Sequence, residues 1–228
     1  MREMKITYLF PSKSRVDKFF NVLENIKTLS ATDNYDVVAV LDNDDTEMNN
    51  DEVRERLSQY PNVKPYYGIS IGKVNAINRE INKIPIDTTI VALQSDDFEV
   101  IKYGFDNDIR EAFSDDFKGL VHFPDGRVNE RLVTYPLMHK EYLDRFGYIY
   151  NPEYKSVFCD NEQMEVAKKL NLYKYVDKKI MIHKHYRGGF GKPDALMEYN
   201  DSEEMYKIDG ETYRRRKAAN FYLDLSKQ

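Results

Sequence analysis

Apolar residues occur in two patterns along the first hundred residues of the chain. Short runs rich in β-branched residues are typical of buried parallel strands, whereas apolar residues at helical spacing predict amphipathic helices. We expect strands at residues 4–10, 36–41, 63–67 and 88–93, and helices at 14–29, 51–60 and 74–84. Pro11 should end the first strand and Ser14 should cap the first helix. This order predicts an α/β fold, with a right-handed, mostly parallel sheet and helices on both faces.

The second half of the chain is less regular. Apolar spacing predicts helices at 105–113, 140–146 and 161–170, and extended segments at 119–123, 132–137 and 175–183. A turn is expected at 124–126 and an aromatic loop at 147–157. We expect His122 in an edge strand and His139 at the start of a helix. The end of the chain should form a loop and a basic helix, and no repeat or linker divides the expected single domain over residues 1–228.

Composition narrows the class of protein. Hydrophobic residues make up 41% of the chain, enough for a core, and charged residues make up 32%. The net charge of −5 argues against a protein that wraps duplex DNA by neutralising phosphates. The single cysteine, Cys159, excludes an internal disulfide framework and a multi-cysteine zinc site. With no signal-peptide pattern and no apolar run of about 18 residues, we expect a soluble cytoplasmic protein without a transmembrane segment.

Acidic residues follow directly after two of the expected core strands. Asp42, Asp44 and Asp45 come after the second strand, and Asp96 and Asp97 come after the fourth. Ligands of open α/β sheets bind beyond the carboxyl ends of the strands. Adjacent half-buried carboxylates repel unless positive charge lies nearby, and Mg²⁺ or Mn²⁺ would supply that charge. Acids after a strand are also common in turns and helix caps, so the prediction of a site depends on both groups being present, on strands that we expect to be neighbours in one sheet.

Four segments together resemble the GT-A glycosyltransferases, especially the family 2 type, across residues 4–190. These segments are YLFPSKSR (Tyr8–Arg15), VLDNDD (Val40–Asp45), GKVNAINREI (Gly72–Ile81) and VALQSDDFEV (Val91–Val100). The resemblance implies a Rossmann-like GT-A fold, a nucleotide-diphospho-sugar donor (a UDP-sugar first of all) and a Mn²⁺ or Mg²⁺ cofactor. It divides the chain into a nucleotide-sugar-binding half (1–100), an acceptor and catalytic half (101–192) and a C-terminal helical tail (193–228).

The resemblance also implies roles for single residues. Asp96 would be the principal metal ligand of a DXD-like motif, with Asp97 in support. The usual run resembles L-D-x-D-D, and Gln94 stands where its first acid is expected. An amide can accept a hydrogen bond from a ribose hydroxyl, but it carries no charge. The residues expected to contact the nucleotide sugar are Pro11, Ser12, Arg15, Asp42, Asp44, Lys73, Asn78, Gln94 and Ser95.

A third acidic segment, SVFCDNEQMEVAKKL (Ser156–Leu170), resembles the start of the helix that carries the family's catalytic base. Asp160 aligns with the base, and Glu162 is the nearest substitute. The alternative is that Asp160 is an N-cap, with Glu162 or Gln163 completing a capping box. A capping carboxylate would have a low pKa, which weakens it as a base.

His183 and His185 lie two residues apart at the end of an expected strand, so both side chains point the same way. The resemblance implies that one C-terminal histidine completes the metal site. We favour His183, with His185 near the phosphates, and a surface turn without a ligand is the alternative. Arg187, in the glycine-rich loop that follows, is expected to close over the diphosphate.

The predicted function is therefore metal-dependent transfer of a sugar to an acceptor hydroxyl of a saccharide or glycan precursor. One alternative acceptor is a hydroxymethylated base in DNA, as in some phage enzymes, with the basic run 214–217 contacting phosphates. The plainer interpretation of that run is a solvated helix that packs on the domain. A non-catalytic nucleotide-sugar binder is a further alternative, because Gln94 weakens the motif. A nucleotidyltransferase is disfavoured, since no glycine-rich basic loop follows the first strand.

Overall fold

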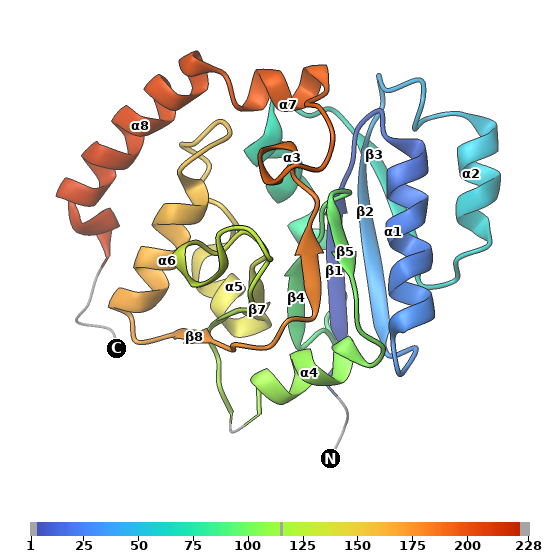
Figure 1. Ribbon diagram of the computed structural model, residues 1–228, viewed down its shortest axis with the longest axis horizontal. Helices are drawn as coiled ribbons and strands as arrows, with labels where there is room; N and C mark the ends of the chain where they lie inside the picture. Colours follow the sequence, from blue (N-terminus) through green and yellow to red (C-terminus); the bar gives the residue numbers. More distant parts are fainter. Residues whose placement is uncertain (1–3, 115, 224–228) are drawn as a thin grey trace.

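The computed structural model describes residues 4–114 and 116–223. Its main sheet has the strand order β3-β2-β1-β4-β7-β6-β8 (Figure 1). Strands β3, β2, β1 and β4 are parallel, and β7 is the one described strand of this sheet that runs in the opposite direction. The predicted mostly parallel α/β sheet is confirmed. The strands are β1 (Ile6–Pro11), β2 (Tyr35–Asp42), β3 (Val63–Gly68), β4 (Ile90–Leu93), β6 (Leu120–His122), β7 (Leu137–His139) and β8 (Tyr173–Tyr175).

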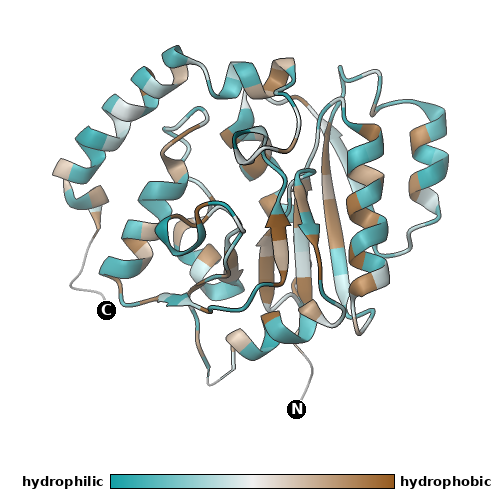
Figure 2. Ribbon diagram, in the orientation of Figure 1, coloured by the Kyte–Doolittle hydropathy of each residue, from teal (hydrophilic) through white to brown (hydrophobic). Residues whose placement is uncertain are grey.

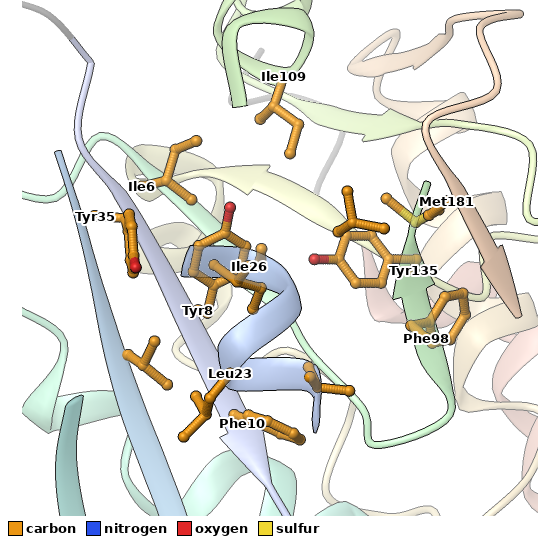
Figure 3. Close-up of a cluster of buried hydrophobic side chains, with 14 of the residues drawn as sticks. Ile6, Tyr8, Phe10, Leu23, Ile26, Tyr35, Phe98, Ile109, Tyr135 and Met181 are labelled. Atoms are coloured by element: carbon orange, nitrogen blue, oxygen red, sulfur yellow. The ribbon is translucent and has the colours of Figure 1, made fainter. Parts of the chain in front are cut away.

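Helices cover both faces of the sheet because each strand sends alternate side chains to opposite sides. In β1, Ile6, Tyr8 and Phe10 enter one core, whereas Leu9 enters the other. Figure 3 shows the first of these cores, in which the rings of Tyr8 and Tyr35 pack edge to face, 5.8 Å apart. Figure 2 shows the apolar character of the central strands. The first core is covered by α1 (Val16–Leu29), α2 (Asp51–Ser58) and α4 (Phe105–Ala112), and the second by α3 (Lys73–Arg79), α5 (Lys140–Phe146) and α6 (Cys159–Lys169).

A second, two-stranded sheet pairs β5 (Phe98–Val100) with β9 (Met181–His183). The strand predicted at 175–183 is therefore two separate strands, β8 in the main sheet and β9 outside it. Residues 176–180 connect β8, at the edge of the main sheet, to β9. Strand β9 pairs with β5, which starts directly after the acids at the end of β4. This connection brings the last third of the chain to the carboxyl end of β4.

Three local predictions are wrong. Ser14 does not cap α1: it adopts a φ of 53°, its N–H and hydroxyl donate to Asp45, and the helix begins at Val16. The segment 132–137 joins the sheet only at Leu137, because Pro136 has no N–H to donate to a ladder. His122 lies in an interior strand, since β8 pairs beyond β6. His139 does begin a helix, as predicted, and its Nδ1 accepts from the Glu141 N–H.

The C-terminal segment forms two helices, α7 (Ala195–Asn200) and α8 (Glu203–Ala218). The predicted basic helix thus begins earlier in the chain, and its last residues, 224–228, lie outside the described residues. None of the helices in the described part of the chain combines the length and apolar character needed to span a bilayer. Short 3-10 helices occur at Ile81–Lys83, Asn129–Arg131, Tyr186–Gly188 and Asn220–Tyr222.

The buried His122 should make stability depend on pH. Burial lowers the pKa of His122 to about 4, below the value of about 6.5 for an unfolded histidine. The unfolded chain then takes up the proton first as the pH falls, so this contribution is present above pH 6.5 and is lost toward pH 4. Between pH 7 and pH 5 the loss amounts to about 2 kcal/mol. His122→Phe should lose less unfolding free energy over this interval than the wild type, by that amount, in urea titrations. Equal losses in the two proteins would contradict the assignment.

Candidate active site

A cavity of about 530 Å³ opens at the carboxyl ends of β1, β2 and β4. This is where open α/β sheets bind their ligands. Its walls come from the loop after β1, the loop between β3 and α3, the end of β4, the loop before α6 and the segment after β9. Segments from both halves of the chain therefore build one site.

Asp96 is buried, and both of its carboxylate oxygens have partners. Ser12 donates its hydroxyl to Oδ2 at 3.0 Å, and the Arg15 guanidinium donates to Oδ1 at 2.7 Å. Burial raises the pKa of Asp96 in spite of the Arg15 charge. Arg15 also forms a bidentate pair with Asp194, at 2.9 and 2.8 Å, which ties the loop after β1 to the start of α7. The positive charge expected beside Asp96 is thus present in the protein itself.

Asp97 has different partners from Asp96 and meets His183. The Asp97 Oδ2 lies 3.2 Å from His183 Nε2, and the Ser95 hydroxyl donates to Asp97 Oδ1 at 2.7 Å. The two side chains meet because β5 and β9 pair Phe98 with His183, and the rings of these two residues stack at 4.1 Å. Although burial acts to raise it, the hydrogen bonds from His183 and Ser95 lower the pKa of Asp97.

His183 also lies close to a carboxylate that the sequence analysis missed. Asp125, in the turn after β6, lies with its Oδ2 3.4 Å from His183 Nδ1. Burial acts to lower the pKa of His183, but the hydrogen bonds with Asp125 and Asp97 outweigh it and raise that pKa. The Pro-Asp-Gly pattern around Asp125 signalled only a turn, and the pairing with a residue 58 positions away carries no local signal.

Gln94, which replaces the expected acid, makes only internal hydrogen bonds. Its Oε1 accepts from the Tyr135 hydroxyl at 2.8 Å, and its Nε2 donates to the carbonyls of Ser95 and Phe98, at 2.8 and 3.3 Å. The side chain is almost fully buried, at 1% exposure. In this arrangement Gln94 holds the turn that carries Asp96 and Asp97.

Asp42 is on the cavity wall, but its strand is not next to that of Asp96. Strand β1 lies between β2 and β4, which corrects the expectation of neighbouring strands. Lys13 and Arg79 each donate to Asp42 at 3.0 Å. Burial acts to raise the pKa of Asp42, but hydrogen bonds from Ser70 and these two cations lower it. Asp44 is exposed and 3.7 Å from Lys13.

Asp160 lines the cavity from the first turn of α6. The N-cap prediction for it is wrong, because the helix starts at Cys159 and the residue at the cap is Phe158, with a φ of 61°. The Asp160 Oδ1 accepts only from the adjacent Asn161 N–H, at 2.9 Å, among the described residues. Burial raises the pKa of Asp160, with Lys73 acting in the opposite direction. The low pKa expected of a capping carboxylate is therefore not found.

Glu162, the proposed substitute base, faces away from the cavity. It is buried at 4% exposure and forms a bidentate pair with Arg216 of α8, at 2.8 and 2.9 Å. The Tyr154 hydroxyl donates to it as well, at 2.8 Å. Because its oxygens are engaged in this way, Glu162 anchors α8 to α6.

Helix α8 also holds the loop that leads to Asp160. The Asp209 carboxylate is fully buried and accepts the backbone N–H groups of Lys155, Ser156 and Val157, at 2.9, 2.7 and 2.8 Å. Phe158, the next residue, stacks on Tyr213 of the same helix at 5.5 Å. The sequence analysis assigned no role to Asp209, since its partners lie more than fifty positions away.

Three of the four residues of the basic run 214–217 are engaged with the rest of the domain, and Arg214 is exposed. Arg216 is buried, and Arg215 and Lys217 also pair with acidic side chains. The interpretation of the tail as a helix that packs on the domain is confirmed, and the phosphate-binding alternative loses its basis. The acidic partners of the three residues are Glu153, Glu162 and Glu165.

The remaining predicted residues divide into two groups. Asn78 lies outside the cavity wall and binds the aromatic loop, donating to the Tyr150 carbonyl at 2.6 Å. Arg187 is on the wall and pairs with Asp201 at 3.3 Å, and His185 accepts from the Arg187 N–H. Burial, aided by the nearby His183, lowers the pKa of His185 to about 4. The other predicted residues on the cavity wall are Pro11, Ser12, Lys73 and Ser95.

Comparisons with known proteins establish the fold. No protein-family model matches the chain, and no curated protein matches its sequence. Among solved structures, the mannosyltransferase PcManGT of Pyrobaculum calidifontis, in complex with GDP-Man and Mn²⁺, has a TM-score of 0.64 at 14% identity, over 97% of this chain and 76% of that one. TarS 1-349 of S. aureus, in complex with UDP-GlcNAc, has a TM-score of 0.67 at 14% identity, over 90% of this chain and 64% of that one.

A solved structure of lower similarity is named as a synthase, so the fold alone does not identify the reaction. The 4-diphosphocytidyl-2C-methyl-D-erythritol synthase of Anaerococcus prevotii has a TM-score of 0.51 at 11% identity, over 78% of this chain and 90% of that one. The chain spans 64% of the TarS chain in the comparison with the UDP-GlcNAc complex and 77% in that with the UDP complex. The chain therefore has the GT-A fold that the sequence predicted, and its chemistry has to be argued from the site.

The hydrogen bonds of Gln94 predict the effect of restoring an acid there. In Gln94→Glu a carboxylate oxygen would replace the amide nitrogen that faces the carbonyls of Ser95 and Phe98. The variant loses a buried N–H donor and places a carboxylate oxygen against two carbonyl oxygens that repel it. We therefore expect a loss of about 1–3 kcal/mol of unfolding free energy at pH 7 in urea titrations. Gln59→Glu, the same change at an exposed position, should stay within about 0.5 kcal/mol of wild type. A Gln94→Glu protein as stable as wild type would contradict the importance of donation from Nε2 to these carbonyls.

Proposed function

We propose that this protein is a metal-dependent glycosyltransferase that moves a sugar from a nucleotide-diphosphate sugar to an acceptor hydroxyl of a saccharide or glycan precursor. The observation that supports this best is the convergence of Asp97, His183 and Asp160 on one cavity at the carboxyl end of a GT-A sheet. Two structures of similar fold contain nucleotide-diphosphate sugars, GDP-Man and UDP-GlcNAc. The proposal extends that donor class to this chain.

The side chains beside β4 suit a divalent cation. Asp97 offers a carboxylate and His183 an imidazole nitrogen, 3.2 Å apart, a donor set that Mn²⁺ accepts. We favour Asp97 over Asp96 as the ligand, because Ser12 and Arg15 engage both oxygens of Asp96. Within the described residues no three such side chains gather around one point, so the diphosphate would supply further ligands. When bound, the cation neutralises charge on the departing diphosphate.

Asp160 is the proposed general base. The acceptor oxygen forms a bond to the anomeric carbon, the bond from that carbon to the phosphate oxygen breaks, and the acceptor proton passes to Asp160. A base works best with a pKa near the working pH, and burial moves the pKa of Asp160 upward in that direction. Lys73, Arg127 and Arg187 on the same cavity wall place positive charge near the leaving diphosphate.

The loop after β1 argues against nucleotidyl transfer. Its two cations are engaged with carboxylates, Lys13 with Asp42 and Arg15 with Asp96 and Asp194. A triphosphate would have to displace these pairs. A sugar donor with a diphosphate requires fewer cations, and those elsewhere on the cavity wall suffice for it.

Donor binding is tested by thermal stabilisation. We expect UDP- or GDP-sugars to raise the melting temperature in the presence of Mn²⁺ and to raise it less in EDTA. A ligand at a hundred times its Kd adds about 2.7 kcal/mol to the free energy of unfolding by mass action. ATP with Mn²⁺ serves as the control for triphosphates. If no nucleotide-diphosphate sugar stabilises the protein in either condition, the proposed function is wrong.

The base is tested with Asp160→Asn, which keeps the shape of the side chain. Turnover, followed as nucleoside diphosphate release, should fall by about 10²–10⁴-fold while donor affinity is kept. Asp144→Asn, at an exposed carboxylate of α5 away from the cavity, is the matched control. Unchanged turnover in Asp160→Asn would place the base elsewhere. Donor binding by a wild type without turnover on any acceptor would favour the non-catalytic binder.

A further inference from the structure

Asp125 lies directly behind the histidine of the proposed metal site. It is fully buried, with 0% exposure, although it lies in a turn where an aspartate is usually solvated. Its Oδ1 accepts three backbone N–H groups, from Arg127, Val128 and Asn129, at 2.8 to 2.9 Å. These bonds form the turn, but they use only one of its two oxygens.

The second oxygen of Asp125 faces His183. Thr134 donates its hydroxyl to Oδ2 at 2.9 Å, and His183 Nδ1 lies 3.4 Å from the same atom. The main chains are joined too, since the His183 N–H donates to the Asp125 carbonyl at 2.8 Å. The His183 ring also stacks on Phe98, so contacts to the backbone, to one ring face and to Nδ1 hold the residue and leave Nε2 facing Asp97.

We propose that Asp125 is a positioning residue for the metal site, and that it holds the Nδ1 proton of His183 so that Nε2 faces Asp97 and the cation. A histidine ligates a metal through an unprotonated nitrogen, and the hydrogen bond at its other nitrogen decides which one that is. Carboxylates bonded to a ligand histidine orient the ring and strengthen its affinity for the metal. This inference rests on the proposed function, because it requires a divalent cation between Asp97 and His183.

The Asn variant of Asp125 separates this role from that of building the turn. Asp125→Asn can keep its Oδ1 bonds to the turn, but it presents an NH₂ group where Oδ2 faced His183. Nδ1 would then have to accept a hydrogen bond, which moves the proton to Nε2 and blocks ligation. Thr134→Val is the matched control, because it removes the other partner of Oδ2 and leaves the carboxylate facing His183.

The test measures Mn²⁺ binding, first without nucleotide and then with UDP, by the electron paramagnetic resonance of the free ion. We expect Asp125→Asn to raise the Kd for Mn²⁺ by about 10–100-fold and to lose the ¹⁴N modulation that imidazole ligation gives in pulsed spectra. His183→Asn should lose both, and Thr134→Val should keep the modulation and stay within about threefold of the wild-type Kd. A merely structural role for Asp125 would not change the ¹⁴N signal of the bound ion.

The outcomes distinguish this inference from the proposed function. If His183→Asn weakens binding but Asp125→Asn binds like wild type with its ¹⁴N signal, the role of Asp125 is overturned and the metal site stands. The role is also overturned if Thr134→Val weakens binding as much as Asp125→Asn, since local packing would then be the cause. If wild type binds no Mn²⁺ either alone or with UDP, or binds it without ¹⁴N modulation, both the metal site and this inference fail.

Discussion

Two adjacent carboxylates, Asp96 and Asp97, follow the buried strand β4, and each needs a positively charged partner. The positions of the residues around the cavity follow from which residues supply these partners. An uncompensated charge in the interior costs several kcal/mol, so Asp96 and Asp97 cannot be left without partners. The two carboxylates have different partners. Arg15, from the loop after β1, pairs with Asp96, and His183, from β9, pairs with Asp97. Neither partner is close in sequence.

These pairings hold the C-terminal third of the chain beside the carboxyl ends of the strands, where Figure 1 shows α7. Arg15 is shared between Asp96 and Asp194, so one guanidinium joins β4 to the cap of α7. On the other side of the cavity, the buried carboxylate of Asp209 binds the loop that carries Asp160. The walls of the cavity are thus fastened by buried charges, each satisfied by groups from a distant part of the chain.

The alternating strands and helices of the first hundred residues could be predicted, because each shows its apolar pattern within its own short segment. The apolar spacing of α1 and the β-branched run of β4 follow from the burial of one face or of both faces. That Asp42 and Asp96 lie at the same edge could be predicted from the parallel order of the sheet. That β1 lies between their strands was not predicted. The pairing of β5 with β9 could not be predicted, since strands of three residues have no periodicity to detect. Asp125, Asp209 and the Arg216 partner of Glu162 were missed for the same reason, because their roles depend only on contacts between distant residues.

The structure explains why Gln94 departs from the family pattern. Compared with that pattern, the residue replaces an expected acid and weakens the motif. In the structure its amide bridges the carbonyls of Ser95 and Phe98, on either side of the two aspartates, while Tyr135 holds its oxygen. A carboxylate could not donate to those carbonyls, and a third negative charge would add to the repulsion already present at the strand end. The amide therefore holds the turn in the form in which Asp96 meets Arg15 and Asp97 meets His183, so Gln94, which also lines the cavity, supports the site whether or not it contacts the nucleotide.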